Sequence, residues 1–206
     1  MNICVFGDSI TWGACDYKQG GWVTRLRNYF EERGDTPMGA DGRLVDVALY
    51  NLGVAGDTSD DLLKRFLAEA EAREPDVVVF SIGTNDSQYF KSRDNPRVPL
   101  ERFKRNMSKL YELALSHTMK IVFIGLLLVD ESKTTPVSWA QDKYYDNQGL
   151  GLYNDALKAL TQEKGILFVD TSKILTSDDL EDGLHPNSEG HAKMFEYVRS
   201  ALIGSL

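Results

Sequence analysis

The chain has 206 residues, of which 42% are hydrophobic and 26% charged, and its formal net charge is −8. This length suffices for a full hydrophobic core, and no linker composition divides the chain, so we expect one domain over residues 1–206. The negative charge argues against nucleic acid and against an anionic membrane surface as the main partner. The longest apolar run, residues 121–129, is too short to cross a bilayer, so stable membrane insertion is not expected.

The beginning of the chain and its cysteines bear on location. The first apolar run follows Met1-Asn2 directly, without the basic and apolar segments of an export signal. Cys4 lies within that run and Cys15 in the loop after it, which favours two reduced thiols over a disulfide. We therefore expect a cytoplasmic protein.

Five apolar runs alternate with segments of helical periodicity. Strands are predicted at residues 3–6, 44–52, 76–82, 121–129 and 166–169. Helices are predicted between and after them, with apolar stripes within residues 22–30, 62–67, 100–114, 152–164 and 192–202. This alternation favours a parallel sheet covered by helices on both faces.

Several residues are predicted to delimit these helices. Gly34 should end the first long helix, Thr58 or Ser59 should cap the second, and Ser188 should cap the last. Residues 35–43 read as a loop, and residues 130–149 as a long, polar, irregular one. A loop of that length within a compact domain is usually functional or mobile.

The segment Gly7-Asp8-Ser9-Ile10-Thr11 comes directly after the first strand. It places Ser9 at the carboxyl end of that strand, where open α/β sheets bind ligands. A hydroxyl beside the backbone N–H groups of a helix start can serve as a nucleophile next to an anion site. Asp-Ser before a helix is also an ordinary N-cap pair, so this segment alone leaves both interpretations open.

Three further segments lie near predicted strand ends or in the last loop, at residues 53–59, 83–86 and 182–185. In a parallel sheet, the carboxyl ends of the strands meet at one edge. The segments bring glycine-rich backbone, Asn85, and Asp182 three residues before His185. With Ser9, these are the components of acyl transfer: a nucleophile, oxyanion donors, and a base with its orienting carboxylate.

These segments resemble four ordered blocks of the SGNH/GDSL hydrolases. The blocks are Gly7-Asp8-Ser9, Gly56 in Ala55-Gly56-Asp57-Thr58, Gly83-Thr84-Asn85-Asp86, and Asp182-Gly183-Leu184-His185-Pro186. The resemblance covers almost the whole chain and implies a three-layer α/β/α, flavodoxin-like fold with a five-stranded parallel sheet. It also implies esterase, lipase, thioesterase or carbohydrate deacetylase activity, without a metal or other cofactor.

The resemblance assigns roles that agree with the chemistry of each residue. Ser9 is implied as nucleophile, His185 as the general base that takes its proton, and Asp182 as the carboxylate that orients the imidazole. The implied oxyanion hole consists of the Ser9 and Gly56 backbone N–H groups and the Asn85 side-chain amide. Glycine at position 56 would let backbone approach the substrate closely.

Other interpretations of single residues stay open. Asn85 and Gly56 also suit plain turns, and Asp8, Asp57 and Asp86 are expected as caps or loop braces. The aromatic residues Trp139, Tyr144 and Tyr145 could anchor the long loop or form a substrate wall. The three histidines, at positions 117, 185 and 191, lack the spacing of a zinc site, so no metal is expected.

The sequence thus predicts a serine ester hydrolase that cleaves a short-chain acyl ester of a small alcohol or sugar through an acyl-enzyme on Ser9. The absence of a long apolar helix or lid weighs against bulk lipid as substrate. Alternatives are a lysophospholipase or thioesterase of the same family and, from another class, a flavodoxin-like phosphate- or nucleotide-binding module. That module would leave Asp182 and His185 without a role, as would a carbohydrate-binding protein descended from an esterase. The oligomeric state is not predicted.

Overall fold

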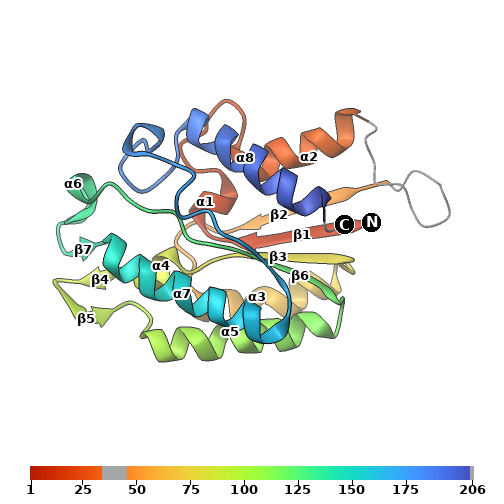
Figure 1. The fold of residues 1–206 in the computed structure, drawn as a ribbon, viewed down its shortest axis with the longest axis horizontal. Helices are drawn as coiled ribbons and strands as arrows, with labels where there is room; N and C mark the ends of the chain where they lie inside the picture. The colour runs from red at the N-terminus through yellow and green to blue at the C-terminus, as the bar shows by residue number, and fades with distance from the viewer. Residues whose placement is uncertain (34–45, 205–206) are drawn as a thin grey trace.

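A computed structural model describes residues 1–33 and 46–204. Its centre is a parallel sheet of five strands in the order β2-β1-β3-β6-β8 (Figure 1). The strands are β1 (Asn2–Gly7), β2 (Ala48–Gly53), β3 (Val77–Ser81), β6 (Lys120–Ile124) and β8 (Leu167–Val169). The predicted α/β class and five-stranded parallel sheet are confirmed.

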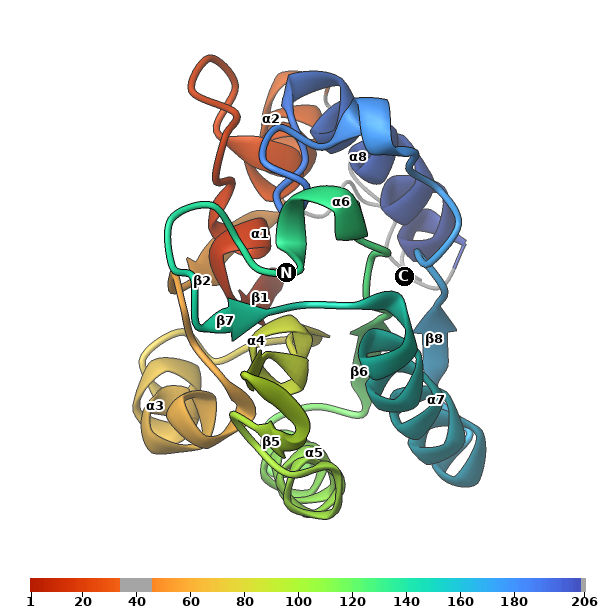
Figure 2. The same cartoon turned by 90° about the vertical axis from the view of Figure 1, so that its left-hand side faces the viewer.

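Helices cover both faces of this sheet (Figure 2). One face carries α2 (Gly21–Arg33) and α8 (Ser188–Ile203), which pack against each other. The other face carries α3 (Ser59–Glu71), α5 (Leu100–Leu115) and α7 (Asn147–Lys164), in that order across the sheet. The result is the predicted three-layer arrangement.

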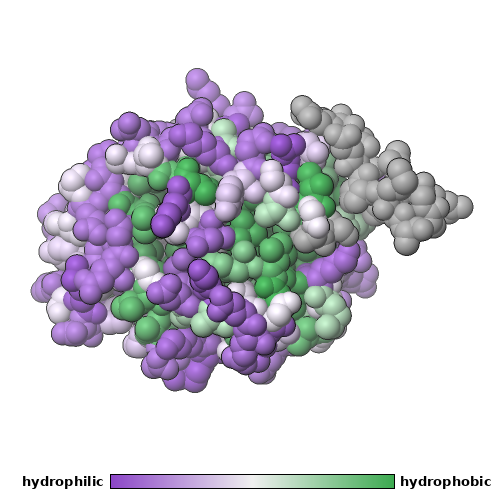
Figure 3. All heavy atoms as spheres, in the orientation of Figure 1, coloured by the Kyte–Doolittle hydropathy of each residue, from purple (hydrophilic) through white to green (hydrophobic). Residues whose placement is uncertain are grey.

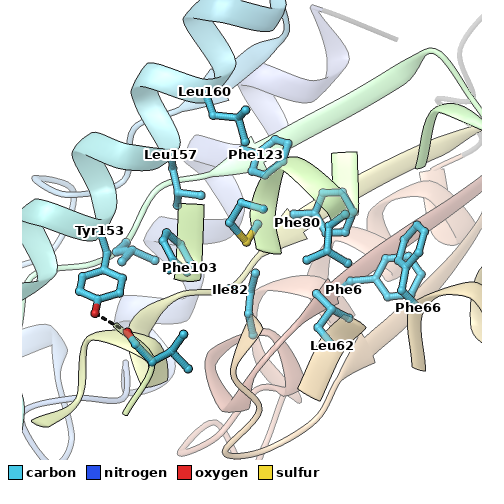
Figure 4. Packing of buried hydrophobic residues seen from close by; sticks show 14 of the residues in the cluster. Phe6, Leu62, Phe66, Phe80, Ile82, Phe103, Phe123, Tyr153, Leu157 and Leu160 are labelled. Carbon is cyan, nitrogen blue, oxygen red and sulfur yellow. Dashed lines mark hydrogen bonds between the residues drawn. The ribbon is translucent and has the colours of Figure 1, made fainter. Parts of the chain in front are cut away.

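Each face of the sheet has its own hydrophobic core, because successive side chains of a strand point to opposite faces. In β1, Ile3 and Val5 lie in the core under α2 and α8, whereas Cys4 and Phe6 lie in the core under α3, α5 and α7. The core under α3, α5 and α7 is rich in aromatic rings, and the Phe6 and Phe66 ring centroids are 4.8 Å apart (Figure 4). Cys4 and Cys15 are both free thiols.

The pairing register aligns the carboxyl ends of β1, β2 and β3. Gly7, the last residue of β1, pairs with Gly53 of β2 on one side and with Ser81 of β3 on the other. Glycine is needed at position 7, because a Cβ there would collide with the Thr11 side chain and the Ser81 carbonyl. The chain runs from β1 to β2 at one edge and returns to β3 on the other side of β1. Loops at such a reversal open a crevice at the carboxyl ends of the strands.

The prediction of a strand over residues 121–129 is wrong beyond Ile124. β6 pairs with the short strand β8 only as far as Val169, and the Gly125 N–H donates to the Val169 carbonyl. The next residue, Leu126, donates its N–H to the Asn154 side chain of α7 instead of to a strand. The apolar run continues as irregular chain that is buried except at Leu128, and apolar composition does not distinguish such a segment from a buried strand.

The long polar segments contain more structure than expected. Short strands β4 (Tyr89–Phe90), β5 (Ser92–Pro96) and β7 (Lys143–Tyr144) form a small antiparallel sheet. Residues 130–149 also contain the short helix α6 (Glu131–Thr134). Helix α7 begins at Asn147, five residues before the predicted 152, because the Asp146 side chain caps it by accepting from the Gly149 N–H.

The helix caps were predicted in part. Thr58, one of the two candidates, caps α3, and its side chain and that of Asp61 form a reciprocal capping box. The last helix is capped by Asn187, whose side chain accepts from two backbone N–H groups, rather than by Ser188. The predicted stop at Gly34, the loop at 35–43 and the first residues of the predicted strand 44–52 lie outside the described residues.

On the face shown in Figure 3, hydrophobic residues gather in the band between α8 and α7, and hydrophilic residues surround it. Among the described helices, none combines the length and the apolar character that crossing a bilayer requires.

Candidate active site

Ser9 is the first residue of the short helix α1 (Ser9–Trp12), directly after β1. The Asp8 side chain caps this helix by accepting from the Ile10 N–H at 2.9 Å. Asp8 is therefore an N-cap, and this cap is compatible with the position of Ser9 at the end of the strand. The cap holds the first turn so that the Ser9 side chain lies at the edge of the sheet.

A chain of hydrogen bonds joins Ser9 to the last loop of the protein. The Ser9 Oγ lies 2.9 Å from the His185 Nε2, and the His185 Nδ1 lies 2.8 Å from the Asp182 Oδ2. The other carboxylate oxygen, Asp182 Oδ1, accepts from the backbone N–H groups of Leu184 and His185. An ionised carboxylate can only accept, so Nδ1 carries the imidazole proton and Nε2 presents a lone pair to the serine. This is the geometry of a Ser-His-Asp triad.

The surroundings keep Asp182 ionised. Burial by itself would raise its pKa, but hydrogen bonds from the His185 ring and from the two backbone N–H groups outweigh burial, and the pKa lies below its usual value. Two other carboxyl groups nearby behave in the opposite way. Burial raises the pKa of Asp8 to about 6 and that of Asp86 to about 7. Asp86 accepts from the Ser59 N–H and hydroxyl, which fits the expected bracing role.

Asn85 lies in the short helix α4 (Thr84–Ser87), just after β3, and is 6% exposed. Its Nδ2 donates to the Asp57 carbonyl at 2.9 Å, and its Oδ1 accepts from the Tyr145 hydroxyl at 3.0 Å. The bond to Asp57 ties Asn85 to the loop that contains Gly56. Among the described residues the second Nδ2 hydrogen has no acceptor, so it can be donated to a ligand.

Gly56 has a φ of +83°, a conformation that favours glycine. Crowding by other protein atoms does not require a glycine here, because a Cβ at this position would meet no protein atom within 4 Å. Within residues 1–33 and 46–204, neither the Gly56 nor the Ser9 backbone N–H donates to a protein acceptor. With Asn85, three loops thus offer unused donors at this edge of the sheet.

The three aromatic residues of the 130–149 segment have three different places. Trp139 is 51% exposed, and its ring centroid is 6.1 Å from that of His185, so it borders the site. Tyr144 stacks on Tyr89 and anchors the small sheet. Tyr145 is 5% exposed and its hydroxyl donates to the Asn85 Oδ1, so of the two interpretations its burial fits the anchor.

Two residues beside the site, Arg65 and Cys15, belong to none of the four sequence blocks. Arg65 of α3 donates to the Asp57 carboxylate at 2.7 Å and to the Gly7 carbonyl at 3.1 Å, so it links the Gly56 loop to the end of β1. Cys15, Asp182 and His185 each have a metal-ligand atom within 4.8 Å of the others, although the last two already bond to each other. His191 is a buried structural residue: its Nε2 bonds to the Ala14 carbonyl, and burial lowers its pKa.

The sequence matches the model of the GDSL-like lipase/acylhydrolase family over residues 5–193. The chain belongs to this family. The matched stretch contains all four segments from which the resemblance was predicted, and that prediction is confirmed.

Several named relatives of this family are esterases. The chain is 24% identical to a multidomain esterase of Ruminococcus flavefaciens, over all of this chain and 29% of that protein. It is 30% identical to the isoamyl acetate-hydrolyzing esterase of Saccharomyces cerevisiae, over 68% of this chain and 62% of that protein. An acetylxylan esterase of Geobacillus stearothermophilus is 25% identical over 76% of each chain. The chain thus spans less than two thirds of the length of the first two relatives.

Solved structures share the fold. A lipase/acylhydrolase from Enterococcus faecalis superimposes with a TM-score of 0.76 at 22% identity, over 100% of this chain and 96% of that one. The acetylxylan esterase of Geobacillus stearothermophilus gives a TM-score of 0.72 at 21% identity, over 98% and 94%. At these identities the comparison establishes the three-layer fold.

Proposed function

We propose that the chain, a carboxylic ester hydrolase by family, cleaves a short-chain acyl ester of a small alcohol or sugar through an acyl-enzyme on Ser9. The observation that carries this proposal is the hydrogen-bonded chain from the Ser9 hydroxyl through the His185 imidazole to the Asp182 carboxylate. A serine hydroxyl is a weak nucleophile until a neighbouring base takes its proton. The 2.9 Å distance between the Ser9 Oγ and the His185 Nε2 supports this step.

In the first half of the reaction, the Ser9 Oγ attacks the ester carbonyl carbon while His185 Nε2 takes its proton. Asp182 stabilises the imidazolium that forms. The negative charge on the carbonyl oxygen is received by the N–H groups of Ser9 and Gly56 and by the free Nδ2 hydrogen of Asn85. Collapse of this intermediate breaks the bond to the alcohol, which leaves with the proton from His185.

In the second half, a water molecule attacks the acyl group on Ser9 and gives its proton to His185. The same three donors receive the second oxyanion. Collapse releases the carboxylic acid and returns the proton from His185 to the Ser9 oxygen. A donor to an oxyanion is worth about 3–4 kcal/mol of activation free energy, so losing one should slow turnover by two to three orders of magnitude.

The preference for a small alcohol or sugar is supported by a groove that begins at Trp12 of α1, the short helix that also contains Ser9. This groove has a volume of about 440 Å³, and its lining includes Trp12, Cys15, Tyr17 and Asn51. Trp12 lies one helical turn after Ser9, and Cys15 lies near Asp182 and His185, so the groove adjoins the site. Exposed aromatic rings next to polar side chains suit a sugar ring or a compact alcohol. The names of two relatives, an acetylxylan esterase and an isoamyl acetate-hydrolyzing esterase, point to acetyl esters.

The test is hydrolysis of p-nitrophenyl acetate by the Ser9→Ala variant. We expect loss of turnover with an unchanged far-ultraviolet circular dichroism spectrum, whereas Ser200→Ala, a change on the exposed side of α8, should leave turnover intact. Undiminished hydrolysis by Ser9→Ala would refute the proposal. A panel of p-nitrophenyl esters of increasing acyl length, together with acetylated sugars, tests the substrate class. Higher kcat/KM on long acyl chains would favour a lysophospholipase or thioesterase instead.

A further inference from the structure

Tyr145 has a fixed place directly behind Asn85. Its neighbour Tyr144 pairs with Tyr89 in the small antiparallel sheet, so Tyr145 points to the opposite side, into the protein. The backbone of Tyr145 is held at both polar groups: its N–H donates to the Thr134 carbonyl, and its carbonyl accepts from the Thr134 hydroxyl. The side chain is therefore positioned by rigid structure, although it follows a long polar segment.

The Tyr145 hydroxyl lies 3.0 Å from the Asn85 Oδ1 and 3.0 Å from the side-chain amide of Gln88. A phenol has one proton and can donate only one hydrogen bond. The Asn85 Nδ2 already donates to the Asp57 carbonyl, which fixes Oδ1 on the side of Tyr145. The tyrosine proton therefore goes to Asn85.

Gln88 completes this arrangement. It is 2% exposed, and its Nε2 has no hydrogen-bond partner among the described residues when its Oε1 faces the tyrosine. Rotation of the amide by 180° turns Nε2 toward the Tyr145 oxygen, which can accept. The rotated amide gives a directed chain of donors from Gln88 to Tyr145 to Asn85, and each bond in such a chain strengthens the next.

We propose that Tyr145 is a positioning residue that holds the Asn85 amide with its free N–H toward the oxyanion. This inference rests on the proposed function and deepens it. The terminal torsion of asparagine is soft, so the amide needs contacts at both ends to keep one orientation. Asp57 holds the nitrogen end and Tyr145 the oxygen end. A turned amide would present its carbonyl oxygen, and so a repulsive partial charge, to the oxyanion.

The hydroxyl is suited to this role over a wide pH range. Burial raises the pKa of Tyr145 above that of an ordinary phenol, so the hydroxyl keeps its proton at neutral pH. Phenylalanine at this position would keep the ring and remove only the donor.

The test is a double-mutant cycle of Tyr145→Phe and Asn85→Ala, assayed with p-nitrophenyl acetate. Loss of one buried hydrogen bond, about 1 kcal/mol, predicts a drop in kcat of about fivefold for Tyr145→Phe, with KM changed less than twofold. Because Tyr145 acts through Asn85, the same change in the Asn85→Ala background should alter kcat less than twofold. The Asn85→Ala proteins must be used at concentrations at which their rate exceeds spontaneous hydrolysis.

Tyr153→Phe is the matched control. The Tyr153 hydroxyl is also buried, and it donates to the Val98 carbonyl and not to Asn85 (Figure 4). We expect its kcat to stay within twofold of the wild type, whatever its effect on the thermal midpoint. An unchanged kcat in Tyr145→Phe would overturn the proposal, and so would an equal loss in the wild-type and Asn85→Ala backgrounds. Retained turnover in Ser9→Ala would instead refute the proposed function itself.

Discussion

Replacing Asp182 by asparagine should reverse the tautomer of His185. In the native site, Asp182 Oδ1 accepts from the Leu184 and His185 N–H groups at 3.0 and 2.8 Å, and Oδ2 faces the imidazole Nδ1. An asparagine keeps its oxygen on the two backbone donors, because turning the amide would set N–H against N–H. Its NH₂ group must then face Nδ1 and donate to it.

The imidazole proton would then move to Nε2, which donates to the Ser9 hydroxyl and can no longer take its proton. The same change in a known serine protease triad lowers kcat by about 10⁴-fold, and we expect a loss of that order here. The two backbone hydrogen bonds survive, so the thermal midpoint should change little.

Two measurements test this reasoning. The kcat for p-nitrophenyl acetate should fall about 10⁴-fold in Asp182→Asn, and ¹⁵N chemical shifts should show the proton on Nε2. Asp178→Asn, an exposed change of the same charge in the same segment, should leave kcat unaltered. An Asp182→Asn protein that keeps kcat within tenfold while its imidazole carries the Nε2 proton would refute the argument.

Two other predictions concern the surroundings of the site. Burial raises the pKa of Asp86 to about 7, above its ordinary value of 3.8, so folding takes up a proton between about pH 4 and 7. The free energy of unfolding should therefore fall as pH rises through that window, by a few kcal/mol at most. Urea unfolding should show a smaller fall in this free energy for Asp86→Asn than for the wild type. A wild-type free energy of unfolding that rises from pH 5 to 7 would contradict this. Arg65→Met should lower kcat about tenfold by releasing the Gly56 loop. Arg102→Met removes an exposed ion pair to Asp60 and should leave kcat unchanged. Equal kcat values in the two variants would contradict the role of Arg65 in holding the Gly56 loop.

The fold was predictable because its main elements are long and periodic. Continuous apolar strands such as residues 76–82 can be recognised without tertiary information, and they order the sheet. The strands of two residues, β4 and β7, have no period to recognise and exist only because they pair with each other. The early start of α7 depends on Asp146, whose capping bond gives no apolar signal.

The candidate site was predictable where a residue's position follows from local sequence. Ser9 and Asn85 come just after strands, and Asp182 and His185 belong to one loop, so strand-end convergence brings them together. Tyr145 differs, because its contact with Asn85 crosses 60 residues and depends on the register of the small sheet. Arg65 reads as a surface residue of a helix, and its bonds to Gly7 and Asp57 appear only when α3 is packed on the sheet.

The central claim is that the Ser9 hydroxyl is the nucleophile activated by His185. Its most direct test is labelling with a fluorophosphonate, followed by peptide mass spectrometry. We predict a single adduct on the peptide that contains Ser9, absent from Ser9→Ala and formed much more slowly in His185→Ala. An adduct on another residue, in protein that still hydrolyses p-nitrophenyl acetate, would contradict the claim.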